Sequence, residues 1–291
     1  MIWHQGFIAV DWGTTNRRAY RVEQDRNVDT FADDLGILSV PAGGFPSAVE
    51  EIRSKLGDLP MLLAGMVGSD RGWREAPYVE CPAGPAELAD QILWVDSRTG
   101  IVPGVRQRGQ FGPDVMRGEE VQLIGGVAAG FIAPDALICH PGTHAKWVEM
   151  QSGRIARFRT MMTGEMFALL REHSILAEAL AGAAAAGAEF DAGAAEALAG
   201  EPLLSALFRI RARGLLEGRS GDGSSRASGI LIGSEIAAAL REFSSKPVAV
   251  MGRTDLCELY SRALHLAGRG SSSTDGREAF LAGIAVLTRN L

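Results

Sequence analysis

The first residues able to do chemistry follow an apolar run, residues 7–10, near the N-terminus. They combine a carboxylate with a small polar segment: Asp11, Gly13, Thr14, Thr15 and Asn16. A glycine lets the backbone approach an anion closely, and the hydroxyl and amide groups after it can donate hydrogen bonds to phosphate oxygens. Asp11 would offer Mg²⁺ a hard oxygen ligand. A capped turn alone explains the same string equally well, so the segment by itself leaves both interpretations open.

The same plan recurs in the second half of the chain. Another apolar run, residues 136–139, leads into a segment that contains Gly142, Thr143 and His144. Aligning Gly13 with Gly142 also matches Arg17 to Lys146, and both segments follow a predicted buried strand. We interpret this recurrence as an internal duplication, which predicts two related α/β domains and favours the phosphate-binding interpretation.

Two adjacent carboxylates, Glu119 and Glu120, begin a predicted helix over residues 119–131. Acidic residues stabilise the first turn of a helix, so a structural role is one interpretation. In the other, one of them is a general base that takes a proton from an attacking hydroxyl group. Adjacent helical residues point about a quarter turn apart, so we expect only one of the two to serve.

A third group lies in residues 65–78, directly after a predicted strand over 61–64. Loops seldom concentrate aromatic and cationic side chains unless they bind something, because ordering such side chains costs entropy. Arg71 or Arg74 would hold a carboxylate, and Trp73 or Tyr78 would cover the face of a sugar. A packed surface loop is the alternative.

The elements that must position these groups follow from the apolar spacing. Residues 7–10 and 18–22 read as the two strands of a hairpin, and residues 247–252 as a later strand. Further helices are predicted over residues 46–56, 163–180, 202–216, 229–243, 255–266 and 277–287. Residues 218–228 and 268–276 are rich in Gly and Ser and are predicted to be loops.

Composition and missing motifs exclude several classes of protein. The 291 residues carry a net charge of −6 without a basic stripe, which argues against a nucleic-acid partner. No Gly-Lys-Ser/Thr follows a glycine-rich stretch and no G-x-G-x-x-G occurs, so a P-loop or Rossmann enzyme is not expected. The Ala-rich residues 177–200 contain acidic residues that exclude a membrane span. Three scattered cysteines predict buried free thiols in a reducing, cytoplasmic compartment.

These motifs resemble those of the 2-dehydro-3-deoxygalactonokinases. The strings that match lie at residues 9–19, 65–69, 72–78, 117–120, 141–147 and 162–165. A looser match continues through residues 231–235, 250–252 and 255–264. The resemblance implies an α/β protein with two duplicated ribonuclease H-like domains, the actin/hexokinase-like ATPase fold, and an interdomain nucleotide cleft. The domains would be residues 1–133, for sugar and phosphate, and residues 134–291, for the nucleotide, with the last helix packing back toward the hinge.

The family's activity would be ATP-dependent and Mg²⁺-dependent phosphorylation of the terminal (6-) hydroxyl of 2-dehydro-3-deoxy-D-galactonate, in galactonate catabolism. By resemblance, residues 11–16 form a first phosphate loop with Asp11 as metal ligand, residues 142–144 form a second, and Gly252 contacts adenosine. The substrate-binding residues would be Arg71, Trp73, Arg74, Glu75, Tyr78 and Arg117. A likeness of residues 117–123 to the catalytic helix of exopolyphosphatases points to Glu120 as the base, with Glu119 as the alternative.

One position departs from the pattern, because the superfamily usually has Asp where this chain has His140. A second carboxylate near the metal would then come from elsewhere, with Glu165 as a candidate. Three other functions stay open: an exopolyphosphatase-like phosphohydrolase, a kinase for another sugar acid, and a nucleotide-binding regulator without catalysis. The sequence also leaves open the stereoisomer of the acid and the oligomeric state, with a homodimer as one alternative.

Overall fold

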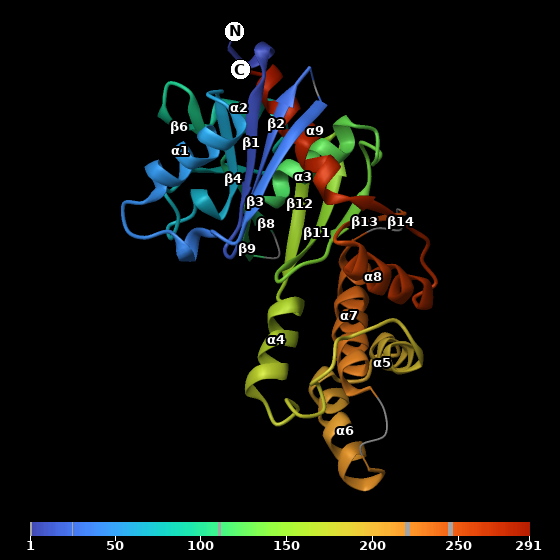
Figure 1. Cartoon of the computed structure of the whole chain (residues 1–291). Helices are drawn as coiled ribbons and strands as arrows, with labels where there is room; N and C mark the ends of the chain where they lie inside the picture. The colour runs from blue at the N-terminus through green and yellow to red at the C-terminus, as the bar shows by residue number, and fades with distance from the viewer. Residues whose placement is uncertain (1, 25, 110–111, 219–221, 244–246) are drawn as a thin grey trace. The chain divides into compact units, whose positions relative to one another are not determined.

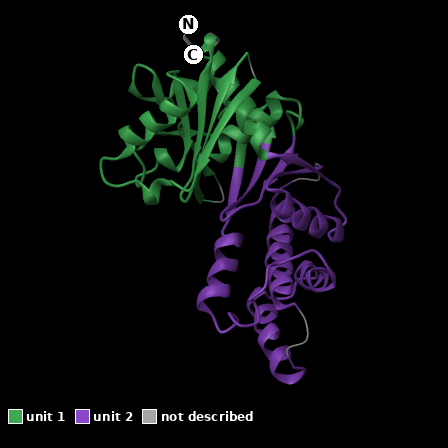
Figure 2. Cartoon of the chain, in the orientation of Figure 1, with its two compact units in different colours: residues 1–135, 150–157, 276–291 green, residues 136–149, 158–275 purple. Residues whose placement is uncertain are grey.

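The computed structural model describes residues 2–24, 26–109, 112–218, 222–243 and 247–291 (Figure 1). The chain divides into two compact units (Figure 2). Unit 1 comprises Met1–Asp135, Met150–Arg157 and Gly276–Leu291, and unit 2 comprises Ala136–Glu149 and Phe158–Asp275.

A six-stranded sheet with the order β3-β2-β1-β4-β7-β6 organises unit 1. Its strands are β1 (Phe7–Trp12), β2 (Arg17–Glu23), β3 (Arg26–Asp33), β4 (Met61–Gly65), β6 (Leu93–Asp96) and β7 (Thr99–Ile101). Strand β1 pairs antiparallel with β2 and parallel with β4. Both β1 and β4 are apolar almost throughout because both of their faces are covered. One face buries Ile8, Val10 and Trp12 in a core shared with helix α1 (Phe45–Leu56).

Two helices, α3 (Glu119–Ala128) and α9 (Gly276–Arg289), pack closely against each other in unit 1. A Cβ atom added at Gly125 would lie 1.9 Å from the carbonyl oxygen of Ala279, and one at Gly283 would lie 2.0 Å from that of Val121. Because no side chain fits at either position, these glycines set the close approach of the two backbones. The catalytic candidates Glu119 and Glu120 therefore begin a helix whose position depends on α9.

The remaining elements of unit 1 are short. They are the 3-10 helices η1 (Ile2–Gln5), η2 (Ile37–Ser39) and η3 (Met66–Gly68), helix α2 (Pro85–Asp90), and a three-stranded sheet of β5 (Tyr78–Glu80), β8 (Gly104–Gly109) and β9 (Gly112–Met116). Strand β9 leads directly into the start of α3.

A five-stranded sheet with the order β12-β11-β10-β13-β14 organises unit 2. Its strands are β10 (Leu137–His140), β11 (Ala145–Gln151), β12 (Arg154–Met161), β13 (Val248–Gly252) and β14 (Ser271–Asp275). The end of β11 and the start of β12, within residues 150–157, belong to unit 1. Strand β10 pairs antiparallel with β11 and parallel with β13, as β1 does with β2 and β4. The two sheets therefore share the pairing pattern around their central strands.

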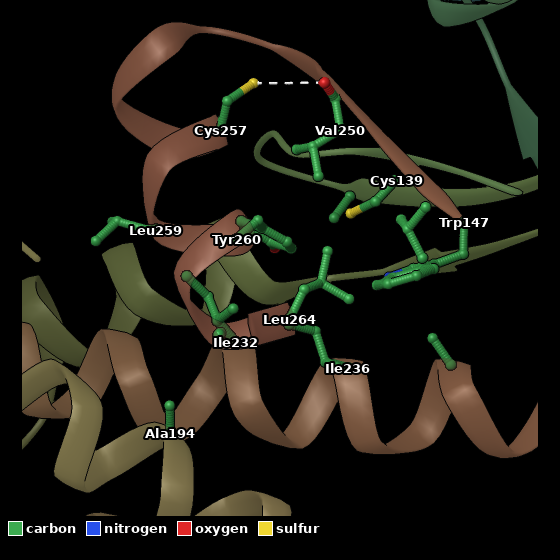
Figure 3. Close-up of a cluster of buried hydrophobic side chains, with 14 of the residues drawn as sticks. Cys139, Trp147, Ala194, Ile232, Ile236, Val250, Cys257, Leu259, Tyr260 and Leu264 are labelled. Atoms are coloured by element: carbon green, nitrogen blue, oxygen red, sulfur yellow. Dashed lines mark hydrogen bonds between the residues drawn. The ribbon is translucent and has the colours of Figure 1, made fainter. Parts of the chain in front are cut away.

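The helices of unit 2 in the described part of the chain are α4 (Thr163–His173), α5 (Ala188–Leu198), α6 (Leu203–Leu216), α7 (Gly223–Glu242) and α8 (Thr254–Leu266). Helices α7 and α8 bury apolar side chains against the sheet (Figure 3). Trp147 from β11, Ile236 from α7 and Tyr260 from α8 all belong to this core.

Several predicted boundaries were wrong. The helix predicted over residues 163–180 ends at His173, because the Ser174 hydroxyl donates to the Leu170 carbonyl and accepts from the Leu176 N–H, replacing the helical bonds. The helix that begins at Glu119 stops at Ala128 instead of residue 131.

Both predicted loops contain regular structure. Within residues 268–276, the segment Ser271–Asp275 forms strand β14 because it pairs in parallel with β13. Within residues 218–228, helix α7 begins at Gly223, since the Asp222 carboxylate caps it by accepting the Ser225 N–H; residues 219–221 lie outside the described residues.

Other expectations fare better. The predicted strands at residues 7–10, 18–22 and 61–64 are confirmed, as are the helices over residues 46–56, 255–266 and 277–287. All three cysteines are free thiols, but Cys81 is only half-buried, unlike Cys139 and Cys257. Within the described part of the chain, no helix combines the length and apolar character that crossing a bilayer requires.

Candidate functional site

Asp11 lies at the carboxyl end of β1, on the opposite side of the strand from Val10 and Trp12. Burial raises the pKa of its carboxyl group to about 6; the nearby Arg18 lowers this pKa and Glu119 raises it. Arg18 is the direct cross-strand partner of Asp11. Arg18 was not among the residues predicted for the site, although pairing within the predicted hairpin was the signal that could have found it.

Three separate segments of unit 1 meet beside Asp11: the ends of β1 and β4 and the start of α3. A Cβ atom added at Gly65 would lie 2.8 Å from the Trp12 carbonyl oxygen and 3.5 Å from Oδ1 of Asp11. One added at Gly118 would lie 3.2 Å from the Cα atom of Gly65. Both glycines have positive φ angles, 93° and 106°, which side chains disfavour. The absence of side chains here leaves backbone close to the Asp11 carboxylate.

The two adjacent glutamates of α3 have different surroundings. Glu119 is half-buried, and its Oε2 accepts a hydrogen bond of 3.2 Å from the Arg117 N–H. Glu120 is fully buried, and burial raises its pKa to about 8, reinforced by the charge of Glu119. Its Oε2 accepts a hydrogen bond from the Gly118 N–H, while its Oε1 has no hydrogen-bond partner among the described residues. A carboxyl group with a pKa near the working pH and a vacant acceptor is suited to general acid–base chemistry.

The hairpin loop between β1 and β2 is braced by its own backbone and by residues 36–38. The Gly13 N–H donates to the Asn16 carbonyl at 2.9 Å, and the Ile37 N–H donates to the Gly13 carbonyl at 3.0 Å. A Cβ atom at Gly36 would lie 2.3 Å from backbone atoms of Thr14 and Thr15. Since the side chains of Thr14, Thr15 and Asn16 are exposed, the loop presents hydroxyl and amide groups to solvent on a fixed backbone.

Arg17, which the duplication matched to Lys146, is fully buried. Its guanidinium donates to both carboxylate oxygens of Asp33, to Glu51 at 2.6 Å and to the Ala48 carbonyl at 2.9 Å. These bonds connect the start of β2 with β3 and α1. Arg17 therefore stabilises the end of the hairpin loop through contacts in the interior of unit 1.

The loop over residues 65–78 divides into packed and exposed side chains. Trp73 is half-buried and stacks on Phe45, with ring centroids 6.3 Å apart and an interplanar angle of 10°. The guanidinium of Arg117 lies over the Tyr78 ring at 4.3 Å and donates to the Ala76 carbonyl at 2.7 Å. The exposed residues are Asp70, Arg71, Arg74, Glu75 and Pro77. Two cations are therefore open to solvent beside a rigid aromatic base.

The second hairpin loop, in unit 2, is held by the start of α4. A Cβ atom at Gly164 would lie 2.4 Å from the Gly142 carbonyl oxygen, and the Glu165 N–H donates to the Thr143 carbonyl at 2.9 Å. Nε2 of His144 lies 2.5 Å from Oε2 of Glu165. Glu165 therefore pairs with His144.

A cavity of about 280 Å³ adjoins this loop within unit 2. Its lining is apolar with a few polar groups and includes Gly164, Phe167, Arg171, Ser228, Arg253 and Leu256. Gly252 precedes the cavity residue Arg253 and lies near the second loop, because a Cβ atom added there would be 3.5 Å from the Pro141 carbonyl oxygen. Gly252 was predicted from the sequence, but the cavity was not, since the walls of the cavity come from α4, α7 and α8, which are far apart in the chain.

The predicted site residues thus form two groups in unit 1 and one group in unit 2. Unit 1 brings together Asp11, Gly13, Thr14, Thr15, Asn16, Glu119 and Glu120, and separately Arg71, Trp73, Arg74, Glu75, Tyr78 and Arg117. Unit 2 holds Gly142, Thr143, His144 and Gly252. The described residues contain no cluster of three or more His, Cys, Asp or Glu side chains placed to hold a metal ion.

Comparisons with known proteins show a full-length similarity. A family model described as 2-keto-3-deoxy-galactonokinase matches residues 11–287. A Rhizobium meliloti (strain 1021) protein assigned as a 2-dehydro-3-deoxygalactonokinase is 38% identical over 97% of this chain and 96% of its own length. The Escherichia coli (strain K12) 2-dehydro-3-deoxygalactonokinase is 34% identical over 96% of each chain.

Solved structures show the same relationship. A Sinorhizobium meliloti protein assigned as a 2-dehydro-3-deoxygalactonokinase has a TM-score of 0.90 at 35% identity, covering 97% of this chain and 98% of its own. Component A of the Acidaminococcus fermentans (R)-2-hydroxyglutaryl-CoA dehydratase has a TM-score of 0.53 at 12% identity, covering 98% of each chain. The second likeness concerns the fold alone, a mixed α/β arrangement of helices and sheets.

Proposed function

Since the chain belongs to the 2-keto-3-deoxy-galactonokinase family, we propose that it transfers the γ-phosphoryl group of ATP to the terminal (6-) hydroxyl of 2-dehydro-3-deoxy-D-galactonate, a step of galactonate catabolism. The observation that carries this proposal is the meeting of Asp11, Gly65 and Gly118 at the start of the helix that bears Glu119 and Glu120. A carboxylate, backbone without side chains and a buried acid therefore lie close together in unit 1.

We also propose that the two units are duplicated ribonuclease H-like domains, each supplying one phosphate loop. The shared pairing of β1 with β2 and β4, and of β10 with β11 and β13, supports this proposal. In both units the candidate loop joins the two antiparallel strands.

Mg²⁺ fits the donor set beside β1. Glu119 is close enough to Asp11 for its charge to raise the pKa of the Asp11 carboxyl group. A cation would therefore relieve their repulsion. Mg²⁺ is usually held by one or two carboxylates together with substrate phosphates and water. When bound, it would neutralise charge on the phosphate oxygens. Asp11 is the ligand that we assign, and the donors after Gly13 would hold the phosphates.

Glu120 is our candidate for the base. Within the part of the chain that the structure describes, its Oε1 has no hydrogen-bond partner, and its pKa is raised to about 8. Both properties suit a group that accepts the proton of the 6-hydroxyl. Glu119 is the alternative because it is the more exposed of the two. Glu119→Gln and Glu120→Gln distinguish them: the variant that loses turnover while keeping ADP binding identifies the base.

The nucleotide would bind unit 2 through its phosphates and its base. Gly142, Thr143 and His144 would contact the phosphates, and the adjoining cavity of about 280 Å³ would take the adenosine beyond Gly252. A largely apolar pocket with a few polar groups is typical of such sites. His144 is paired with Glu165, so we assign Glu165 to holding His144 instead of the metal.

The sugar acid carries a carboxylate, and the exposed Arg71 and Arg74 are the cations that we assign to it. Glu75 is an exposed acceptor in the same loop, and we assign it to the sugar hydroxyls. Trp73, Tyr78 and Arg117 form the packed base of this loop and would shape the pocket for the sugar.

The proposal is tested by a coupled assay of ADP release over a panel of aldonic and 2-keto-3-deoxy sugar acids. We expect turnover with the galactonate-derived acid to exceed that with its stereoisomers. ADP release with a different acid alone would assign another sugar-acid kinase. Phosphate release from polyphosphate without any acid would contradict kinase activity and favour the phosphohydrolase.

We propose a cytoplasmic location, which the three free cysteines support because thiols persist in reducing compartments. The homodimer also stays a prediction. Light scattering of the purified protein at several concentrations would test it, with a mass near 62 kDa, twice the chain mass of 30.9 kDa, as the expected result.

A further inference from the structure

We propose that Glu235 is a positioning residue for the second phosphate loop and acts on it through Thr163, the first residue of α4. This inference rests on the proposed function, since it assumes that residues 142–144 bind nucleotide phosphates. Glu235 lies on α7, in the loosely matched segment over residues 231–235, and the proposed mechanism gives it no role.

The carboxylate of Glu235 joins three elements inside unit 2. Its side chain is 5% exposed. Oε1 accepts a hydrogen bond of 2.7 Å from Nε1 of Trp147 on β11. Oε2 accepts one of 2.8 Å from the Tyr260 hydroxyl on α8 and another from the Thr163 hydroxyl on α4. Trp147 and Tyr260 are anchored in the core of unit 2 (Figure 3), so the carboxylate ties α4 to a rigid part of the unit.

The hydrogen bond from Thr163 to Glu235 is important because α4 makes few other buried contacts. None of the 11 residues of α4 is buried, although Phe167 and Leu170 pack partly against a neighbouring cluster. A helix without buried side chains lacks most of the packing that normally holds it in place. The hydrogen bond from Thr163 is therefore one of the few contacts that fix the first turn of α4 to the core of unit 2.

That first turn is in direct contact with the second phosphate loop. Gly164 packs against Gly142 so closely that its Cβ atom would lie 2.4 Å from the Gly142 carbonyl oxygen and 2.8 Å from the Cα atom of Thr143. The Glu165 N–H donates to the Thr143 carbonyl at 2.9 Å, and the Glu165 carboxylate contacts His144. A displacement of the turn would therefore displace the backbone that faces the phosphates.

Thr163→Val tests the link with little change in shape, and Thr163→Ser is its matched control because it keeps the hydroxyl. We expect Thr163→Val to raise the Kd for ADP, measured by calorimetry, about fivefold, as the loss of one hydrogen bond suggests. The KM for ATP should rise by the same factor, while the KM for the sugar acid stays constant. Thr163→Ser should stay within about twofold of the wild type. Equal affinities in all three proteins would overturn the inference.

Glu235→Gln provides the second variant. It replaces the carboxylate, which has two acceptor oxygens, with an amide that has one acceptor oxygen and one NH₂ donor. We expect a weaker affinity for ADP and a smaller loss from Thr163→Val in this background than in the wild type, since both changes act on the same hydrogen bond. If Thr163→Val weakens ADP binding by the same factor in both backgrounds, Thr163 acts on the nucleotide independently and the inference is wrong. Thermal melting confirms that each variant is folded at the assay temperature.

The two proposals fail separately. A wild-type protein that binds ADP with these variant effects, yet phosphorylates none of the acids, would overturn the proposed function and leave the role of Glu235 intact. Full phosphorylation of the acid, with unchanged ADP affinity in Glu235→Gln and Thr163→Val, would support the proposed function and overturn the role of Glu235.

Discussion

Oε2 of Glu120 accepts a hydrogen bond of 2.7 Å from the Gly118 N–H, while Oε1 of the same carboxyl group is buried and has no partner in the described ranges of the chain. The group is therefore only half satisfied when ionised, and burial raises its pKa to about 8. Near neutral pH the protonated form predominates. This has consequences for both stability and catalysis.

Stability should fall as the pH rises from about 4.5 to about 8. In this window the native state keeps the Glu120 proton that the unfolded state, with its ordinary value of 4.5, has released. The native state thus binds more protons, and the free energy of unfolding decreases by at most about 1.4 kcal/mol per pH unit. Urea denaturation of the wild type and Glu120→Gln across this range isolates the effect. Parallel stability curves for the two proteins would refute it.

Turnover should rise with pH up to about 8, because Glu120 must be ionised to accept a proton. The measurement is kcat/KM for the sugar acid between pH 6 and 9 with saturating ATP. We expect Glu120→Gln to lose at least about 100-fold in kcat, the usual contribution of a general base. A variant with nearly full activity would shift the assignment to Glu119.

Asp11→Asn should abolish ADP release that depends on the sugar acid. Loss of the metal carboxylate removes charge stabilisation of about 3 kcal/mol or more, which is at least about 100-fold in rate. The variant should fold as well as the wild type, since burial raises the pKa of Asp11 and thus disfavours its charged form. Steady-state kinetics combined with thermal melting checks both parts. Undiminished activity would remove Asp11 from the metal site.

Gly283→Ala should destabilise the protein by about 2 kcal/mol or more, because its Cβ atom would lie 2.0 Å from the Val121 carbonyl oxygen. Gly214→Ala is the matched control, since Gly214 is also helical but has nothing within 4 Å of an added Cβ atom. That control should gain about 0.5–1 kcal/mol from helix propensity. Chemical denaturation compares the two. Because α3 shifts with α9, kcat should also fall in Gly283→Ala alone.

Gly36→Ala should weaken ATP binding, since its Cβ atom would lie 2.3 Å from the backbone of Thr14 and Thr15. Displacing this loop by even a fraction of an ångström moves the phosphate donors, and we expect the KM for ATP to rise about tenfold. Gly270→Ala has nothing within 4 Å of the added atom and should behave like the wild type. An unchanged KM in Gly36→Ala would show that the loop tolerates movement.

The sequence predicted those elements whose signals are local. The strand before Asp11, the hairpin return after Asn16 and the helix start at Glu119 are all present, because alternation, a tight turn and an acidic first turn act within a few residues. Strand β14 was missed for the opposite reason. Its sequence, Ser-Ser-Ser-Thr-Asp, resembles a loop, and only its pairing with β13 makes it a strand.

The two hairpin loops align in sequence, but the alignment does not predict their cross-strand pairing. Arg17 and Lys146 are matched in sequence, but Arg17 pairs with Trp12 while Lys146 pairs with His140. The second loop is therefore one residue longer. Pro141 occupies the position that corresponds to Trp12, and a proline cannot donate to the ladder.

The sequence alone determined the two hairpins with their polar loops, the paired glutamates at a helix start, and the family to which they belong. These depend on the order of neighbouring residues. The tertiary structure decided that Arg17 is buried against Asp33 and Glu51, that Glu120 is buried and Glu119 is not, and that Glu235 meets Thr163. Those outcomes depend on contacts between residues far apart in the chain, where burial and partner geometry set the energy of each charged group.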